Sequence, residues 1–587
     1  MPFVTLDIPA GVVKHGTDSH SNGRWTDANL VRWINGSLRN IAGWQYRVSL
    51  DNAIYRASIA WKANDGTGYF AAGSATHLTV MDDANTVTDI TPVNMPAPAA
   101  TLVYNLGYGK GAYGQEKYGQ PKTNIGVTAY KDIWSLGTWG QYLVGCKTGP
   151  IYEWQANPAN PAAIIANSPV ADAIAVTEER FLFAFGADNN KRLVKWCDRE
   201  DNTVWTAAAT NEAGDMELST HGEILQGLSV RGKTLILTTS DAHTATYLGP
   251  PVVYGFEKVG SSCGSISRHS GIAIDEGAFW MGEKSFFHYN GSAVRELPCD
   301  VHDHVFNNMN QYTKYLSFGI NNGLHNELWW FYPSKGSLEN DSYVIYNYTE
   351  NYWNIGKIER STGVDAGVFQ KPLYVDGRHV FNHETLNVYE NSQGYPYAKT
   401  GPLQIGNGDQ LMSVTEVIPD YRGRNAVSGD IDFRVVLKAR MYPNADDVVV
   451  DMTEFTDTTP VRLQGREVRV EIYGGAFDFN YDNITNAALR ATVNLPEPFI
   501  SDEVNGRMIG DLNNDGFISS ADAVGWLDGR NNIWGDTVDY DFYYNHVMPY
   551  LLGQLPLSEP LINNIGENVD GFILGKVRLN VEPSSKR

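Results

Sequence analysis

The segment from Asp511 to Asp522, DLNNDGFISSAD, places oxygen-bearing residues at a spacing that suits a hard cation. Side-chain oxygens recur at positions 1, 3, 5, 9 and 12 of the segment, and a glycine at position 6 allows the sharp turn that such a loop needs. The spacing predicts a calcium site of structural role. Its expected ligands are Asp511, Asn513, Asp515, the carbonyl of Phe517, Ser519 and Asp522.

The aspartate at the last position and the Gly510-Asp511 pair at the start resemble the calcium loop of dockerins. Dockerins carry two such loops. Here the following segment, residues 535–555, offers a second helix, but Val538 and Tyr540 stand where a second loop would need oxygens. The departure separates the chain from the two-loop dockerin pattern and leaves the calcium prediction in place.

Two shorter motifs allow other chemistry. Gly260-Ser-Ser262-Cys-Gly264 matches the GxSxG elbow of esterases, which requires a strand, a sharp turn and then a helix. The residues that follow have strand character, so the glycines are interpreted as a turn between sheets.

Cys299, His302 and His304 could bind zinc, or they could belong to a buried turn with hydrogen-bonded histidines. We find no nucleotide-binding or metalloprotease motif and no convincing carboxylate pair, and the chain is predicted not to be an enzyme.

Composition narrows the class of protein. The chain has 587 residues, of which 42% are hydrophobic, 12% aromatic and 19% charged, which is typical of a folded protein rich in strands and turns. A formal net charge of −22 argues against wrapping of DNA, because phosphate binding requires lysine and arginine stripes. The acidity either serves solubility or lets DNA slide past without adhering. Neither a signal peptide nor a membrane span is predicted.

A short antiparallel meander recurs along most of the chain. Its clearest copy is Leu328–Gly356, in which two aromatic strands flank a turn rich in Pro, Gly, Ser and Asn. Successive copies start roughly 40 to 55 residues apart, the range of a four-stranded propeller blade. The copies are centred on 69–80, 142–154, 181–196, 234–247, 278–289, 328–348 and 372–381. The prediction is a mainly β protein with a β-propeller of about six or seven blades.

The remaining residues divide into three further parts. Residues 1–53 are interpreted as an N-terminal arm or platform segment, 54–399 as the propeller, and 400–475 with 570–587 as a C-terminal β platform. Residues 476–569 are predicted to form an inserted, dockerin-like calcium-binding domain with helices, because REVRVEIY and GFILGKVRLNV on either side read as consecutive strands of one sheet. A Gly/Tyr-rich insert at 106–122 is either a disordered loop or a protruding hairpin that grips a partner.

The segment RWTDANLVRWINGSLRNIAGW, residues 24–44, resembles the opening of the tail nozzle proteins of short-tailed bacteriophages, also called tail tubular or packaged-DNA stabilisation proteins. The similarity continues through 194–218, 245–267, AFWMGEKSFFHYNG, NELWWFYPSKGS and YNYTENYWNIG, and it ends in RLQGREVRVEIYG and ILGKVRLNVEPSSKR. These stretches cover most of the chain outside 476–569.

This resemblance implies a β-propeller with an added β platform, assembled as a ring of six below the portal and adaptor proteins of a virion. Such a ring closes the DNA-filled head, continues the ejection channel without sequence-specific DNA binding, and carries fibres or spikes on its outside. The expected location is the virion tail, after assembly in the host cytoplasm. The alternative is a dockerin-bearing, carbohydrate-binding or carbohydrate-active propeller, which would explain the calcium loop and the aromatic residues.

Overall fold

The computed structural model describes residues 4–6, 8–16, 18–98, 102–104, 125–127, 132–385, 396–404, 410–422, 433–442, 445–452, 459–474, 503–504, 507–508 and 573–583. The chain divides into two compact units. One unit contains residues 11–20 and 47–383, and the other contains residues 1–10, 21–46 and 384–587. Among the described residues, no helix has the length and apolar character needed to cross a membrane.

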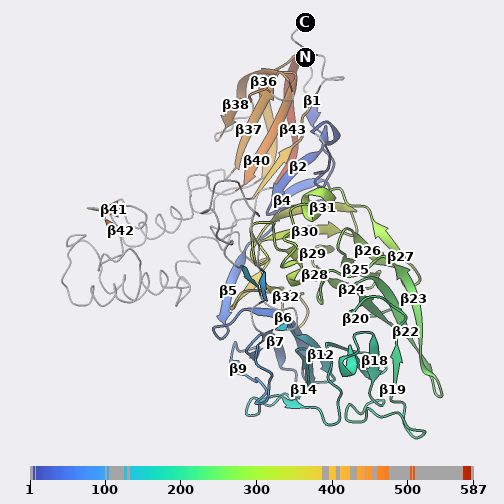
Figure 1. Ribbon diagram of the computed structural model, residues 1–587. Helices are drawn as coiled ribbons and strands as arrows, with labels where there is room; N and C mark the ends of the chain where they lie inside the picture. Colours follow the sequence, from blue (N-terminus) through green and yellow to red (C-terminus); the bar gives the residue numbers. More distant parts are fainter. Residues whose placement is uncertain are drawn as a thin grey trace, which may run out of the picture. The chain divides into compact units, whose positions relative to one another are not determined.

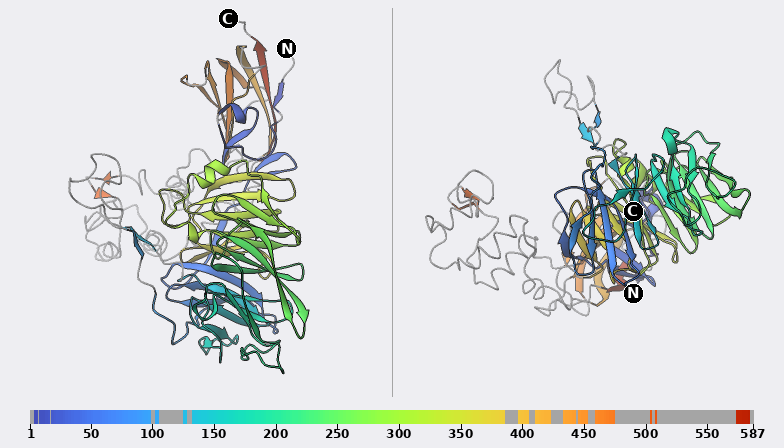
Figure 2. Two further views of the ribbon diagram at one scale, coloured as in Figure 1. Left: turned by 45° about the vertical axis from the view of Figure 1, so that its right-hand side comes forward. Right: turned by 90° about the horizontal axis from the view of Figure 1, so that it is seen from below.

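The larger unit is a β-propeller of seven four-stranded antiparallel sheets, which follow one another in chain order (Figures 1 and 2). Blades 1 to 3 are β6 (Tyr55–Lys62), β7 (Gly68–Ser74), β8 (Leu78–Asp82) and β9 (Val87–Asp89); β12 (Ser135–Trp139), β13 (Tyr142–Cys146), β14 (Ile151–Trp154) and β15 (Ala163–Ile164); and β16 (Ala173–Val176), β17 (Leu182–Phe185), β18 (Leu193–Trp196) and β19 (Gly214–Glu217).

Blades 4 to 6 are β20 (Ile224–Val230), β21 (Lys233–Thr238), β22 (Asp241–Gly249) and β23 (Val253–Ser261); β24 (Gly271–Ile274), β25 (Gly277–Met281), β26 (Phe286–Tyr289) and β27 (Val294–Leu297); and β28 (Phe318–Asn322), β29 (Glu327–Tyr332), β30 (Ser342–Asn347) and β31 (Tyr352–Lys357). Blade 7 combines β32 (Thr362–Val364), β33 (Leu373–Asp376) and β34 (His379–His383) with β5 (Trp44–Ser49).

The first strands of the blades contact one another in a closed circle. Contacts run from β6 through β12, β16, β20, β24, β28 and β32, and β32 returns to β6. Each predicted meander copy falls on the hairpin formed by the second and third strands of one blade, so the propeller prediction is confirmed. Strand β5 comes before blade 1 in the sequence and supplies the fourth strand of blade 7, which joins the two ends of the ring.

Aromatic side chains pack the blades against one another. Strand β29 is buried along its whole length, because both of its faces lie against neighbouring blades. The indole nitrogens of Trp134 and Trp330 donate to the backbone oxygens of Ser74 and Ser270 in neighbouring blades, at 2.8 Å each. The buried tryptophans therefore combine apolar burial with a satisfied polar group. These rings serve the core and are not an exposed platform for sugars.

The smaller unit holds a platform of two antiparallel sheets (Figure 1). One sheet runs β3 (Val31–Ile34), β4 (Ser37–Asn40), β43 (Ile573–Pro583), β36 (Met412–Arg422) and β39 (Thr459–Gly465), and β1 (Val4–Leu6) also pairs with β43. The other runs β2 (Trp25–Asn29), β35 (Tyr397–Thr400), β40 (Glu467–Gly474), β37 (Phe433–Arg440) and β38 (Val448–Met452).

The strand pairing in the platform overturns one expectation. The REVRVEIY and GFILGKVRLNV segments lie in different sheets, since β40 pairs with β35 and β37 whereas β43 pairs with β36, β4 and β1. The prediction that they are neighbours is wrong, because alternation identifies a strand but does not specify its partner. Residues 1–53, interpreted as an arm or platform segment, contribute strands to both platform sheets and to blade 7.

The remaining described elements are short. They are the hairpins β10 (Leu102–Tyr104) with β11 (Ile125–Val127) and β41 (Glu503–Val504) with β42 (Arg507–Met508), the helix α1 (His302–Phe306), and the 3-10 turns η1 (Asp18–Ser21), η3 (Ala187–Asn189) and η4 (Lys314–Leu316). The Gly/Tyr-rich insert and most of the predicted inserted domain lie outside the described residues.

Candidate functional site

The predicted calcium ligands, Asp511, Asn513, Asp515, Phe517, Ser519 and Asp522, all lie outside the described residues. Calcium binding by this loop therefore stays a prediction from its spacing.

The GxSxG motif joins two blades. It begins at the end of β23 and leads through a turn into β24, with no helix after the serine. A Cβ atom on Gly264 would lie 2.0 Å from the backbone oxygen of Thr239. The close approach of these two backbone segments therefore requires glycine at position 264. The interpretation as a turn between sheets is confirmed, and the strand–turn–helix arrangement of an esterase elbow is absent from this described segment.

The three residues of the possible zinc site do not converge on one point. His302 begins helix α1, where its Nδ1 contacts Asp303 Oδ1 at 3.2 Å and its Nε2 donates to the Lys284 oxygen at 2.6 Å. Burial raises the pKa of the Cys299 thiol, which keeps it protonated. The hydrogen bonds match the alternative of a turn with a hydrogen-bonded histidine, but this turn is not buried, because the His302 side chain is 42% exposed.

One face of the propeller carries the connections between blades and the turns between second and third strands; we call it the connection face. Arg268 and His269, in the connection from blade 4 to blade 5, reach across this face. The Arg268 guanidinium donates to the Ile133 oxygen at 3.2 Å and to Thr148 Oγ1 at 3.0 Å. His269 Nε2 donates to the Trp134 oxygen at 2.7 Å. Since blades 2 and 5 are not neighbours in the ring, these bonds cross its middle.

The arginine that crosses the ring is buried and lies close to a carboxylate. Arg268 is 5% exposed, and its Nη2 lies 3.9 Å from Asp172 Oδ1. The other oxygen of Asp172 accepts a bond from Lys191 Nζ at 2.6 Å. Burial lowers the pKa of His269 to about 4, so its ring is neutral at physiological pH. We call Arg268, His269 and Asp172 the cross-brace.

The opposite face, which carries the turns between first and second strands, is the turn face. Exposed carboxylates stand in three of these turns: Asp65 between β6 and β7, Glu178 between β16 and β17, and the pair Asp275 and Glu276 between β24 and β25. The pKa of Tyr348 is raised, first by burial and then by neighbouring carboxylates that include Glu276. The turn face therefore presents several acidic groups, together with exposed basic groups such as Arg180 and Arg231 in turns of the same kind.

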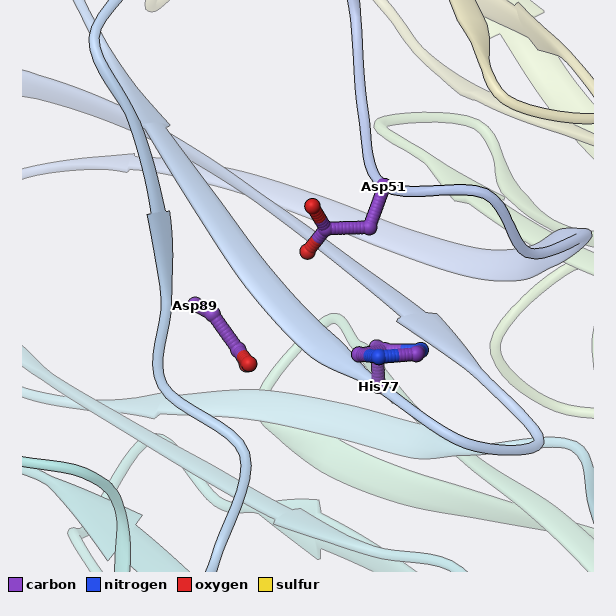
Figure 3. A group of neighbouring side chains, drawn as sticks. All are labelled: Asp51, His77 and Asp89. Carbon is purple, nitrogen blue, oxygen red and sulfur yellow. The ribbon is translucent and has the colours of Figure 1, made fainter.

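A mixed group of possible metal ligands lies on the connection face, where blade 7 leads into blade 1. Asp51 is in the connection from β5 to β6, His77 is in the turn before β8, and Asp89 ends β9. One ligand atom from each of the three lies within 4.8 Å of the other two. Figure 3 shows the side chains directed toward a shared space. It is the one such group of three or more ligands among the described residues.

Sequence reasoning missed this group and the cross-brace. Asp51, His77 and Asp89 are spread over 39 residues with no spacing that matches a metal motif. The cross-brace joins residues more than 100 positions apart. The assignment of strands to blades could have indicated both groups, because it predicts which turns lie on the same face of the propeller.

A buried carboxylate supplies a pH-dependent contribution to stability. Asp241 at the start of β22 is 2% exposed, and burial alone would raise its pKa. Bonds from Lys258 Nζ (2.7 Å), Thr238 Oγ1 (2.6 Å) and Thr220 Oγ1 (2.7 Å), with a contribution from His243, outweigh burial and lower the pKa to about 2.

Because the folded pKa lies below the unfolded value of about 3.9, this contribution is fully present above about pH 4 and is lost as the pH falls toward 2. Its size is about 2 kcal/mol. The Asp241→Asn variant is expected to lose less stability than the parent between pH 4 and pH 2. Urea midpoints measured across this range test the difference, with the exposed Asp215→Asn as the control. Parallel curves for parent and Asp241→Asn would contradict the assignment.

No family model and no curated protein sequence matches the chain. Among solved structures, the virginiamycin B lyase from Staphylococcus aureus is similar at 7% identity, with 58% of this chain and 99% of that chain covered and a TM-score of 0.35. The N-terminal domain of Nup159 is similar at 8% identity, covering 64% and 98%, with a TM-score of 0.32. A glycoside hydrolase is similar at 10% identity, covering 73% and 96%, with a TM-score of 0.24.

Proposed function

We propose that this chain is the tail nozzle protein of a short-tailed bacteriophage. In the proposal, six copies form a ring that closes the head–tail channel and becomes the conduit for DNA ejection. The observation that carries the proposal is the combination of a propeller with a two-sheet β platform, which is the architecture that the resemblance of residues 24–44 and the later stretches implies. The chain acts as a structural virion component, not as an enzyme.

The net acidity of the chain supports a conduit of this kind. The formal net charge is −22, and exposed carboxylates stand in the turns of the turn face. A negatively charged wall repels phosphate groups, and DNA can then move past it without the adhesion that lysine and arginine side chains would cause. DNA in this proposal is a passing cargo with no sequence-specific contact.

The cross-brace bears on where the DNA would run. Arg268 and His269 bond to blade 2 across the middle of the propeller, so the axis of each propeller is crossed by buried protein groups. In the proposed hexamer the conduit is therefore the opening enclosed by six subunits and not the axis of any one propeller. Portal and adaptor proteins would bind one end of the ring, and fibres or spikes would bind its outside.

Calcium belongs to the same proposal. The loop from Asp511 to Asp522 would bind one calcium ion within an inserted domain, where the ion would hold the loop in shape. The ion has no role in the passage of DNA in this scheme. The assignment rests on the spacing of the oxygen ligands.

Electron microscopy tests the proposed function directly. The purified full-length chain, alone and mixed with the portal and adaptor proteins of the phage that the proposal implies, is expected to give six-fold rings in negative stain. Gold-labelled antibody raised against the chain is expected to mark the tail vertex of intact particles. Absence of rings in both samples together with unlabelled particles would overturn the proposal. Retention of the chain on polysaccharide or on cohesin instead would favour the carbohydrate-directed alternative.

A further inference from the structure

We propose that Asp51, His77 and Asp89 bind one divalent transition-metal ion, Zn²⁺ or Mn²⁺, at the junction of blade 7 and blade 1. This site is separate from the calcium loop and is independent of the proposed tail function. It would join three segments of the propeller: the connection that follows β5, the turn between β7 and β8, and the end of β9. The ion would thus hold the point at which the propeller ring closes.

The donor atoms are close together and available. One ligand atom of each residue lies within 4.8 Å of the other two, and Figure 3 shows them facing one another from three different segments. Separations of this size can contract to the ligand spacing of a four- to six-coordinate ion through side-chain rotation, because Asp51 and Asp89 are exposed and His77 is half-buried.

Hydrogen bonds orient two of the ligands and leave a donor atom on each. Thr76 Oγ1 lies 2.8 Å from His77 Nδ1, which leaves Nε2 for a metal. This arrangement, in which one imidazole nitrogen bonds to the protein and the other to the ion, is typical of metal-binding histidines. Asp89 Oδ1 accepts bonds from the Thr91 amide, at 2.9 Å, and from the Thr91 hydroxyl, which leaves Oδ2.

The charge balance at this point favours a cation. Two carboxylates share the site, and within the described part of the chain neither forms an ion pair with a lysine or arginine. A divalent ion would convert this repulsion between carboxylates into attraction for a shared centre.

The donor set selects the kind of metal. Two carboxylates and one imidazole suit Zn²⁺, Mn²⁺ or Fe²⁺, whereas Ca²⁺ and Mg²⁺ prefer oxygen ligands only. Three protein ligands leave further positions for water. We therefore expect Zn²⁺ and Mn²⁺ to bind here, and we expect Ca²⁺ to bind preferentially at the loop from Asp511 to Asp522.

Metal uptake by the tag-free full chain is the test. After chelator treatment and exchange, the parent protein is dialysed against micromolar Zn²⁺, and bound metal is counted by mass spectrometry. The parent is expected to retain one more equivalent of Zn²⁺ than Asp51→Asn or His77→Gln. The same extra equivalent should remain in the double variant Asp511→Ala/Asp515→Ala, in which the calcium loop lacks two ligands. Glu223→Gln, which removes an exposed charge elsewhere in the propeller, serves as the charge control.

Two further measurements identify the ligands and the structural effect. Bound Mn²⁺ should show nitrogen coupling in its electron spin-echo spectrum, and His77→Gln should abolish it. Zn²⁺ should raise the melting temperature of the parent by several degrees and leave that of Asp51→Asn unchanged, with circular dichroism confirming that both are folded. Equal Zn²⁺ uptake by the parent and by both site variants, or no uptake at all, would overturn the proposal.

Discussion

The Trp330→Ala variant should lose about 3–5 kcal/mol of the free energy of unfolding of the propeller. Trp330 is fully buried in β29, and its ring packs against Phe286 at 4.9 Å and Trp353 at 6.3 Å between centroids. The substitution removes most of this packing and leaves a cavity that the two rigid blades cannot close. It also removes the indole donor to the Ser270 oxygen, a buried acceptor on the neighbouring blade.

Urea unfolding followed by far-ultraviolet circular dichroism measures this loss. The matched control is Leu324→Ala in the turn of the same blade, where the side chain is 53% exposed and the expected change is within about 0.5 kcal/mol. Similar midpoints for the two variants would show that Trp330 does not anchor the blade interface. A milder variant, Trp330→Phe, keeps most of the ring packing. Its free energy of unfolding should lie between those of Trp330→Ala and Leu324→Ala.

The Arg32→Met variant should destabilise the platform unit by about 3–5 kcal/mol. Arg32 in β3 forms a two-pronged pair with Glu384: Nη1 to Oε2 is 3.0 Å, and Nη2 to Oε1 is 2.5 Å. The two side chains are only 3% and 7% exposed. Removal of the guanidinium leaves the Glu384 carboxylate buried without its counter-charge, which costs more than the pair itself contributes.

A double-mutant cycle separates the pair from its surroundings. Arg32→Met/Glu384→Gln should recover part of the stability lost in Arg32→Met, because the double variant no longer buries an unpaired charge. The parent, Arg32→Met, Glu384→Gln and the double variant are compared by urea midpoint at pH 7. A double variant that is no more stable than Arg32→Met would mean that the loss comes from packing of the arginine stem and not from the charge.

The blades were predictable because their middle hairpins carry a local signal. In β29 and β30, both faces are buried, so the strands appear in the sequence as short apolar and aromatic runs bounded by turn residues. The fourth strand of blade 7 gives no such signal. In β5 only Trp44 is buried, and its partner β34 lies more than 300 residues away, so no local pattern links the two.

The candidate sites also differ in whether a local sequence pattern could predict them. The calcium loop was predictable because its ligands are consecutive and their spacing alone determines the geometry. Asp51, His77 and Asp89 are brought together by the turns and connections of the folded blades, and Arg268 contacts Ile133 across the ring. Such groups depend on tertiary topology, which spacing along the chain does not encode. The same limit explains the wrong pairing of REVRVEIY with GFILGKVRLNV.

The positions of β1, β4 and β5 in the sequence affect how the chain folds during its synthesis. Strand β5 is made before blade 1 but must wait for β34, and β1 and β4 must wait for β43 near the other end. At ribosomal rates of about 5–20 residues per second, the 587 residues take roughly 30 s to 2 min to emerge. During that interval both units keep unpaired strand edges that can associate with other nascent chains. Slow emergence of the last residues should therefore lower the yield of folded protein, and nascent-chain binding by a chaperone should raise it.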